Sequence, residues 1–240
     1  MEPRRADVQV FADPTTLARE IASRICALAL QGSDRFAICC SGGSTPKLLY
    51  EALAEPSIAV RFPWSRVHWF WGDERFVPHD HPDSNFRMIR EAMLSKVPAP
   101  AANIHSIPTE TETAEQAAHQ YERELAEFYR SDTLTVSRPL FDVVLLGLGE
   151  DGHTASLFPG HSALTESTHW AAPVIGLKPE ARITLTYPAL NSASNVAFLV
   201  TGQAKREVFA RARSGELSLP AARINPSGRL HWFCDQAAAP

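Results

Sequence analysis

No run of apolar residues in this 240-residue chain approaches the roughly 20 that a membrane-spanning helix needs. The N-terminal segment MEPRRADVQVFAD carries two arginines but lacks the apolar stretch of a signal peptide. An excess of positive charge is also missing, because the formal net charge is -4, which gives no general attraction to nucleic acid or to an anionic membrane. We therefore expect a soluble cytoplasmic protein that binds neither, and in which local positive groups hold any anionic ligand.

Cysteine is scarce as well, with four residues and no CxxC pair, and the HExxH signature of zinc hydrolases is absent. Cys39 and Cys40 would point to opposite faces of a predicted strand, so we expect reduced thiols in the core. The remaining metal candidates are histidines. His79 and His81 in PHDHPD could chelate an ion, but such pairs in loops are usually only polar, and we predict no metal site.

Apolar residues recur with the period of helices or strands along most of the chain. Helices are predicted at 14–31, 46–53, 84–96, 111–130 and 203–213, and strands at 35–40, 66–71, 141–147, 182–187, 195–202 and 230–234. Strands that alternate with helices imply a mostly parallel sheet, because parallel neighbours need crossover connections. We predict an α/β fold, with one Rossmann-like sheet and helices on both faces, in a single domain over 1–240 with a flexible tail at about 235–240.

Three loops follow predicted strands and would meet at the carboxyl edge of such a sheet. The first is SGGSTP, where Gly42 and Gly43 permit a tight turn while Ser44 and Thr45 offer hydroxyls beside the free N–H groups of a helix start. These features suit a phosphate group. An ordinary strand-to-helix turn would have the same sequence features, and residue types alone leave both interpretations open.

The second loop, GDERFVPHDHPD, begins with Asp73, Glu74 and Arg75 after a strand rich in tryptophan and phenylalanine. Charge at a strand end is often only a solvated cap. The planar guanidinium of Arg75 could instead hold a carbonyl or hydroxyl oxygen of a substrate, since it positions oxygen atoms well.

The third stretch, LLGLGEDGHTASLFPG, contains Gly147, Gly149 and Gly152 in the GxGxxG pattern of a dinucleotide site. Glu150 and Asp151 disfavour that interpretation, because they would place two negative charges where a pyrophosphate must bind. A nicotinamide enzyme is therefore not favoured.

The glycines of this stretch can instead present His153, with Asp151 two residues away to orient the ring or to stabilise its charge. A lone histidine is usually structural, but this one follows a strand beside an acid. No GxSxG or catalytic-cysteine signature accompanies it, so water is the more natural nucleophile. Arg182 and Lys205, each a surface charge when taken alone, could complete a phosphate clamp with SGGSTP.

Taken together, SGGSTPKLLY, WGDERFVPHDHPDSNFR, LLGLGEDGHTASLFPG and the RITLT segment resemble the 6-phosphogluconolactonases of the glucosamine-6-phosphate isomerase superfamily. The resemblance spans nearly the whole chain. It implies hydrolysis of 6-phospho-D-glucono-1,5-lactone to 6-phospho-D-gluconate, the second step of the oxidative pentose phosphate pathway, without a metal or an organic cofactor.

The resemblance also implies roles for individual residues. His153 would be the general base, with Asp151 supporting it and Arg75 placing the lactone or stabilising charge on its carbonyl oxygen. The substrate and its phosphate would contact Gly42, Gly43, Ser44, Thr45, Asp73, Asn85, Arg87, Arg182 and Lys205.

Two rival functions remain. The related deaminases typically read DEY where this chain has residues 73–75, and they carry a glutamate where this chain has Phe158, a residue that cannot relay a proton. A non-catalytic sugar-phosphate sensor is the other rival, although His153 and Arg75 argue against it. A monomer and a weak homodimer are both compatible with the sequence.

Overall fold

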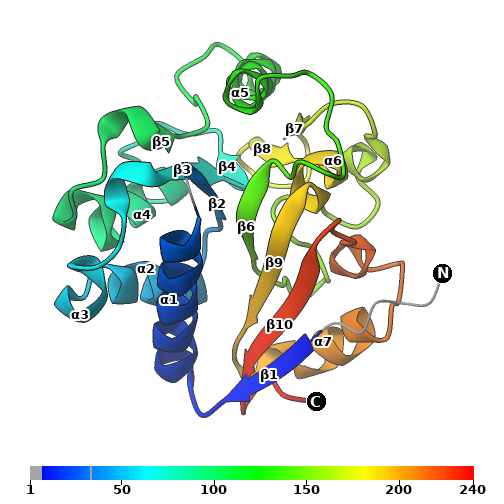
Figure 1. Cartoon of the computed structure of the whole chain (residues 1–240). Helices are drawn as coiled ribbons and strands as arrows, with labels where there is room; N and C mark the ends of the chain where they lie inside the picture. The colour runs from blue at the N-terminus through cyan, green and yellow to red at the C-terminus, as the bar shows by residue number, and fades with distance from the viewer. Residues whose placement is uncertain (1–6, 33) are drawn as a thin grey trace.

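The computed structural model describes residues 7–32 and 34–240, and its centre is a seven-stranded sheet in which every pairing is parallel (Figure 1). The strands run in the order β1 (Asp7–Phe11), β10 (Arg229–Asp235), β9 (Ala193–Val200), β6 (Phe141–Leu146), β2 (Phe36–Cys40), β3 (Val67–Trp71) and β5 (Ile104–His105). The apolar runs of β2, β6 and β9 occupy the middle of this order because both faces of these strands are covered. Cys39 and Cys40 are buried there as free thiols.

Helices flank this sheet (Figure 1). The first begins where the sequence predicts, because the Asp13 side chain accepts a hydrogen bond from the backbone N–H of Thr16 and Pro14 fits the first turn. The α-helices are α1 (Pro14–Gln31), α2 (Ser44–Leu53), α3 (Pro56–Ala59), α4 (Asn85–Ala92), α5 (Ala114–Tyr129), α6 (Tyr187–Asn191) and α7 (Arg206–Arg213). Short 3₁₀ helices are η1 (Trp64–Arg66), η2 (Leu94–Lys96), η3 (Ala101–Asn103), η4 (Ser162–Thr165), η5 (Gln203–Lys205) and η6 (Pro220–Arg223). The predicted α/β fold class is confirmed.

A second, three-stranded antiparallel sheet was not predicted. It runs in the order β4 (Asp73–Arg75), β8 (Arg182–Leu185) and β7 (Ala171–Val174), and α5 packs against β7 and β8 (Figure 1). The predicted loop at 72–83 therefore begins with a strand, and the strand predicted at 182–187 belongs to this small sheet. β4 escaped prediction because three charged residues give no apolar alternation.

The end of the chain, for which a flexible tail at about 235–240 is predicted, makes contacts with the fold. Asp235 is the last residue of β10, and its carboxylate accepts hydrogen bonds from the backbone N–H groups of Ala238 and Gly202. Ala238 is fully buried. Residues 235–238 thus pack against the fold. Separately, no helix within the described residues is both long and apolar enough to cross a membrane.

Candidate active site

A cleft of about 300 Å³ opens at the carboxyl ends of β2, β6 and β9, beside β4 and β8. Of the predicted site residues, the loop after β2 and the start of α2 contribute Gly42, Gly43, Ser44 and Thr45 to its lining. The second sheet and the start of α4 contribute Asp73, Arg75, Arg182 and Asn85, and the loops after β6 and β9 contribute His153 and Lys205. The structure therefore brings ten predicted residues from six separate segments into one hollow.

The imidazole of His153 is held by Asp151. Its Nδ1 lies 2.5 Å from Asp151 Oδ1, the same oxygen accepts the His153 backbone N–H at 3.1 Å, and the Asp151 side chain itself does not line the cleft. When Nδ1–H donates to the carboxylate, Nε2 is left with a free lone pair. Such a ring can take a proton from a water molecule in the cleft.

The charge of Asp151 supports this assignment of the ring proton. Burial raises the pKa of this carboxyl, but the hydrogen bonds and the charge of His153 outweigh burial, so the net shift of the Asp151 pKa is downward. The carboxylate is therefore ionised at neutral pH. An ionised carboxylate can only accept a hydrogen bond, so it fixes the proton on Nδ1.

The glycines of this loop make room for the pair. A Cβ on Gly149 would lie 2.0 Å from His153 Nδ1 and 2.6 Å from Asp151 Oδ1, so any side chain at this position would displace the His153 ring and the Asp151 carboxylate. Gly152 has a φ of +81°, in the left-handed region that favours glycine. The GxGxxG pattern thus serves the placement of a histidine and an aspartate.

The loop after β2 is shaped for close approach of a ligand to the backbone. Gly43 has a φ of +107°, and no side chain caps the first turn of α2. The first N–H groups of that helix consequently face the cleft without a side-chain partner, the usual arrangement of an anion site. Thr45 shares a hydrogen bond of 2.6 Å with Thr201, which also lines the cleft.

Two arginines lie directly opposite each other in the second sheet. Arg75 of β4 and Arg182 of β8 are register partners, and the Nε of each is buried with no hydrogen-bond partner among the described residues. Burial lowers the pKa of Arg182; the charge of Asp73 opposes this shift and the charge of Arg75 adds to it. Two neighbouring cations with unused donors favour an anionic or oxygen-rich ligand.

Glu74 is a buried residue whose role the sequence did not indicate. Its carboxylate accepts backbone N–H groups from Arg75, Asn85 and Phe86 at 2.7–2.8 Å. Burial raises the pKa of Glu74, and those hydrogen bonds partly offset the rise. Glu74 thereby ties β4 to the start of α4 and positions Asn85, whose amide Nδ2–H donates to the Asp73 carbonyl at 2.9 Å.

Phe158 packs against the proposed base. Its ring centroid lies 4.5 Å from that of His153, and the guanidinium of Arg182 lies 5.7 Å from the same phenyl ring. In the sequence, this position was notable only because the related deaminases carry a glutamate there. In the structure, Phe158 joins the imidazole and the arginine through one apolar surface.

One predicted residue lies elsewhere. Arg87 bonds to Glu91 at 2.8 Å and to the carbonyl of Asp80 at 2.9 Å, and it borders a separate hollow. Arg87 does not reach the cleft because it follows Asn85 by two positions on α4. Two positions correspond to a rotation of about 200°, so the two side chains lie on nearly opposite faces of the helix. Only Asn85 of this pair reaches the cleft.

Lys205 and the two histidines of PHDHPD have identifiable partners in the structure. Lys205 pairs with Glu150 at 3.8 Å and keeps its place in the cleft lining. His79 and His81 lie against the carbonyl of Ile107 and the backbone N–H of Asp83, and in the described part of the chain neither joins a group of three or more potential metal ligands.

Comparisons with known proteins place the chain in a family. The profile of the family described as glucosamine-6-phosphate isomerases/6-phosphogluconolactonase matches residues 12–232. A 6-phosphogluconolactonase of Nostoc sp. is 44% identical over 238 residues, covering 96% of each chain. One of Synechocystis sp. is 46% identical over 217 residues, covering 88% of this chain and 86% of the relative.

Solved structures give the same result. The crystal structure of a 6-phosphogluconolactonase from Thermotoga maritima superposes with a TM-score of 0.82 at 31% identity, covering 96% of this chain and 100% of that one. The resemblance found in the sequence motifs is thus confirmed over most of the chain. The protein belongs to the glucosamine-6-phosphate isomerase/6-phosphogluconolactonase family.

Proposed function

We propose that the protein hydrolyses 6-phospho-D-glucono-1,5-lactone to 6-phospho-D-gluconate, the second step of the oxidative pentose phosphate pathway. The observation that carries this proposal is the pairing of His153 Nδ1 with Asp151 in a cleft that also holds two arginines with unused donors. The names of the relatives at 44% and 46% identity support the same activity. All the groups the reaction needs belong to one chain, so no partner subunit is invoked.

The chemistry begins with water. A lactone is an activated ester, so the protein has to hold it, deprotonate the water and stabilise the oxyanion. Nε2 of His153 accepts a proton as the water oxygen bonds to the carbonyl carbon, and the carbonyl oxygen becomes negative. Arg75 lies in the cleft as a cation that can stabilise that oxygen.

Collapse of the tetrahedral intermediate breaks the bond between the former carbonyl carbon and the ring oxygen. The imidazolium of His153 returns its proton to that oxygen, which becomes the hydroxyl of the open-chain acid. The negative charge of Asp151 stabilises the imidazolium between the two steps, since the two side chains are in contact. The product acid then ionises, and the base is regenerated.

The phosphate end of the substrate would lie over the start of α2. Uncapped N–H groups, the hydroxyls of Ser44 and Thr45 and the cations of Arg182 and Lys205 border this part of the cleft. Binding a phosphate there fixes the lactone carbonyl relative to His153. Binding energy remote from the reacting carbon is thus used for orientation.

Two observations argue against the rival activities. Phe158 occupies the position where the deaminases carry a glutamate, and a phenyl ring packed on His153 cannot relay a proton to a sugar ring oxygen. A binding-only sensor would have no need of an imidazole whose proton is fixed by a carboxylate.

The test is turnover of three compounds by the purified protein. Freshly made 6-phosphogluconolactone is assayed with 6-phosphogluconate dehydrogenase as the coupling enzyme and corrected for spontaneous opening. Unphosphorylated gluconolactone and glucosamine 6-phosphate are assayed in parallel. We expect fast hydrolysis of the phosphorylated lactone, much slower hydrolysis of gluconolactone and no ammonia from glucosamine 6-phosphate. Release of ammonia, or binding of the lactone with no turnover, would refute the proposal.

A further inference from the structure

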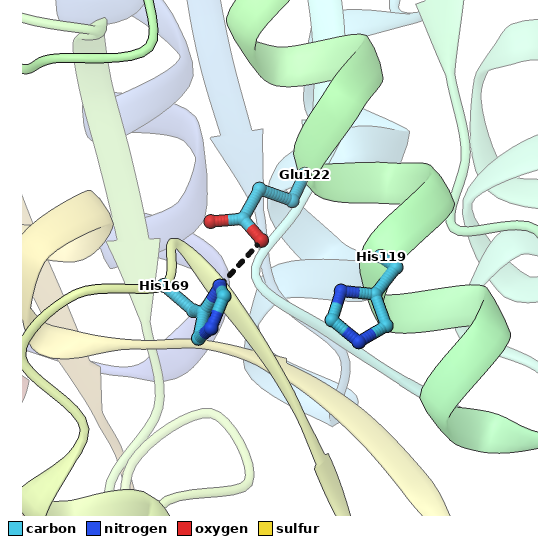
Figure 2. A group of neighbouring side chains, drawn as sticks. All are labelled: His119, Glu122 and His169. Carbon is cyan, nitrogen blue, oxygen red and sulfur yellow. Dashed lines mark hydrogen bonds and ion pairs between the residues drawn. The ribbon is translucent and has the colours of Figure 1, made fainter.

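The geometry points to a zinc-binding site formed by His119, Glu122 and His169, outside the cleft. His119 and Glu122 lie one turn apart on α5 and therefore share a face of that helix, while His169 comes from the segment that leads into β7 (Figure 2). In the described part of the chain these are the only three potential ligands that gather in this way. The inference goes beyond the proposed lactonase activity and does not depend on it.

The three side chains already face a common point. The ligand atoms of all three lie within 4.8 Å of one another. His169 Nδ1 lies 2.9 Å from Glu122 Oε2, and the rings of His119 and His169 meet edge to face with centroids 5.7 Å apart. The packing of α5 on the small sheet creates this meeting, since residues 119 and 169 are 50 positions apart in the sequence.

The second oxygen of the Glu122 carboxylate is held by the backbone. Glu122 Oε1 accepts the backbone N–H of Trp170 at 2.7 Å, which leaves Oε2 directed at His169. The backbone N–H groups of Thr168 and His169 donate to Glu166 at 2.7 and 2.9 Å, which fixes the turn that carries the second histidine. One oxygen of Glu122 and the ring of His169 are therefore oriented before a metal binds.

His119 is not explained by the ion pair of Glu122 and His169. Among the described residues the His119 ring has no hydrogen-bond partner, its side chain is exposed, and its one ring contact is with His169. A metal ion would use this free ring nitrogen. The arrangement is a carboxylate–imidazole pair with a second imidazole beside it that could become the third ligand.

Two imidazoles and one carboxylate suit Zn²⁺ better than Mg²⁺ or Ca²⁺, which prefer oxygen ligands. In a tetrahedral zinc site with bonds of about 2.0–2.1 Å, neighbouring ligand atoms are about 3.4 Å apart. The widest separations, which lie within 4.8 Å, need to shrink by up to about 1.4 Å, and the 2.9 Å between His169 Nδ1 and Glu122 Oε2 needs to open by about 0.5 Å. Both histidines are exposed enough to turn. The ion replaces the proton between His169 and Glu122, and water fills the fourth position.

A bound ion would join α5 to the segment before β7. β7 pairs with β8, which carries Arg182 at the cleft. Zinc should therefore stabilise the attachment of the small sheet to α5 and raise the melting temperature of the whole protein.

The test is calorimetric titration of chelator-treated full-length protein with zinc chloride. Wild type should bind one ion with a dissociation constant in the micromolar range, and its melting temperature should rise. His119→Gln and His169→Gln should each weaken binding at least tenfold and abolish the rise. His161→Gln is the matched control, because that histidine lies outside the cluster and should leave the affinity unchanged.

A second control separates this site from the cleft. His153→Ala removes the imidazole beside Asp151 and should keep the zinc affinity of wild type. Circular dichroism of His119→Gln verifies folding, which we expect to be unchanged because this exposed ring bears no hydrogen bond among the described residues. The inference is overturned if His119→Gln binds zinc like wild type, or if binding disappears in His153→Ala. Neither result bears on lactone hydrolysis.

Discussion

Replacement of Asp151 by alanine should slow catalysis more than it impairs substrate binding. Asp151 contacts His153 through Nδ1 at 2.5 Å and through the backbone N–H at 3.1 Å, so it sets both the proton position and the orientation of the base. A hydrogen bond to a charged group contributes about 1.5–3 kcal/mol, and each 1.4 kcal/mol is a factor of about ten. The Asp151 side chain is 48% exposed, so solvent screening favours the lower part of that range.

We therefore expect Asp151→Ala to lower kcat by roughly 10- to 30-fold with KM little changed. Asp151→Asn separates two contributions, because its carbonyl oxygen can still accept both N–H groups and only the negative charge is lost. The asparagine variant should lie between wild type and alanine.

The assay is the coupled measurement of 6-phosphogluconate formation over a range of lactone concentrations. Both variants are compared with wild type at the same pH. Wild-type kcat in Asp151→Ala would refute the claim that this carboxylate supports the base. A change confined to KM would place Asp151 in substrate binding instead.

Three further predictions concern other parts of the molecule. Lys205→Ala should raise KM for the phosphorylated lactone chiefly, since Lys205 borders the proposed phosphate end of the cleft, and an unchanged KM would place this lysine outside that site. Gly149→Ala should lower kcat at least tenfold while the protein stays folded by circular dichroism, because the added Cβ would overlap His153 Nδ1, and normal activity would contradict that geometry. Burial, with smaller contributions from the charges of His105 and Arg35, lowers the pKa of His68 from 6.5 to about 4. Between pH 6.5 and 4 the unfolded chain therefore binds more protons than the folded one, so the free energy of unfolding should fall as the pH is lowered from 6.5 to 4. Chemical denaturation at a series of pH values measures this fall. His68→Gln should flatten this slope, and an equal slope in both proteins would contradict the assignment.

Long periodic segments and strand-end loops could be predicted because each reflects a local physical requirement. The helical period at positions 17, 21, 25 and 28, with Asp13 and Pro14 before it, defines α1 without any tertiary information. The glycine loops were found because tight turns between a strand and a helix need such residues. Parallel strands then bring those loops to one edge of the sheet, which is why ten predicted residues line one cleft.

What could not be predicted depends on contacts between distant segments. β4 has three residues and exists because β8 pairs with it, so no local pattern marks it. Glu74 is defined by three backbone donors, two of which come from α4. Arg87 was assigned to the site because it belongs to the same sequence motif as Asn85. The motif does not take the rotation of the helix into account, which directs Arg87 and Asn85 to different faces of α4. The contact of Phe158 with His153 likewise needs the folded loop.

The central claim is that His153, oriented by Asp151, activates water against a phosphorylated lactone. The most direct measurement is kcat for freshly made 6-phosphogluconolactone with wild type and with His153→Ala, corrected for spontaneous hydrolysis. A positioned general base contributes about 10²- to 10⁴-fold, so the variant should lose activity by a factor in that range. A His153→Ala protein that hydrolyses the lactone at the wild-type rate would contradict the account.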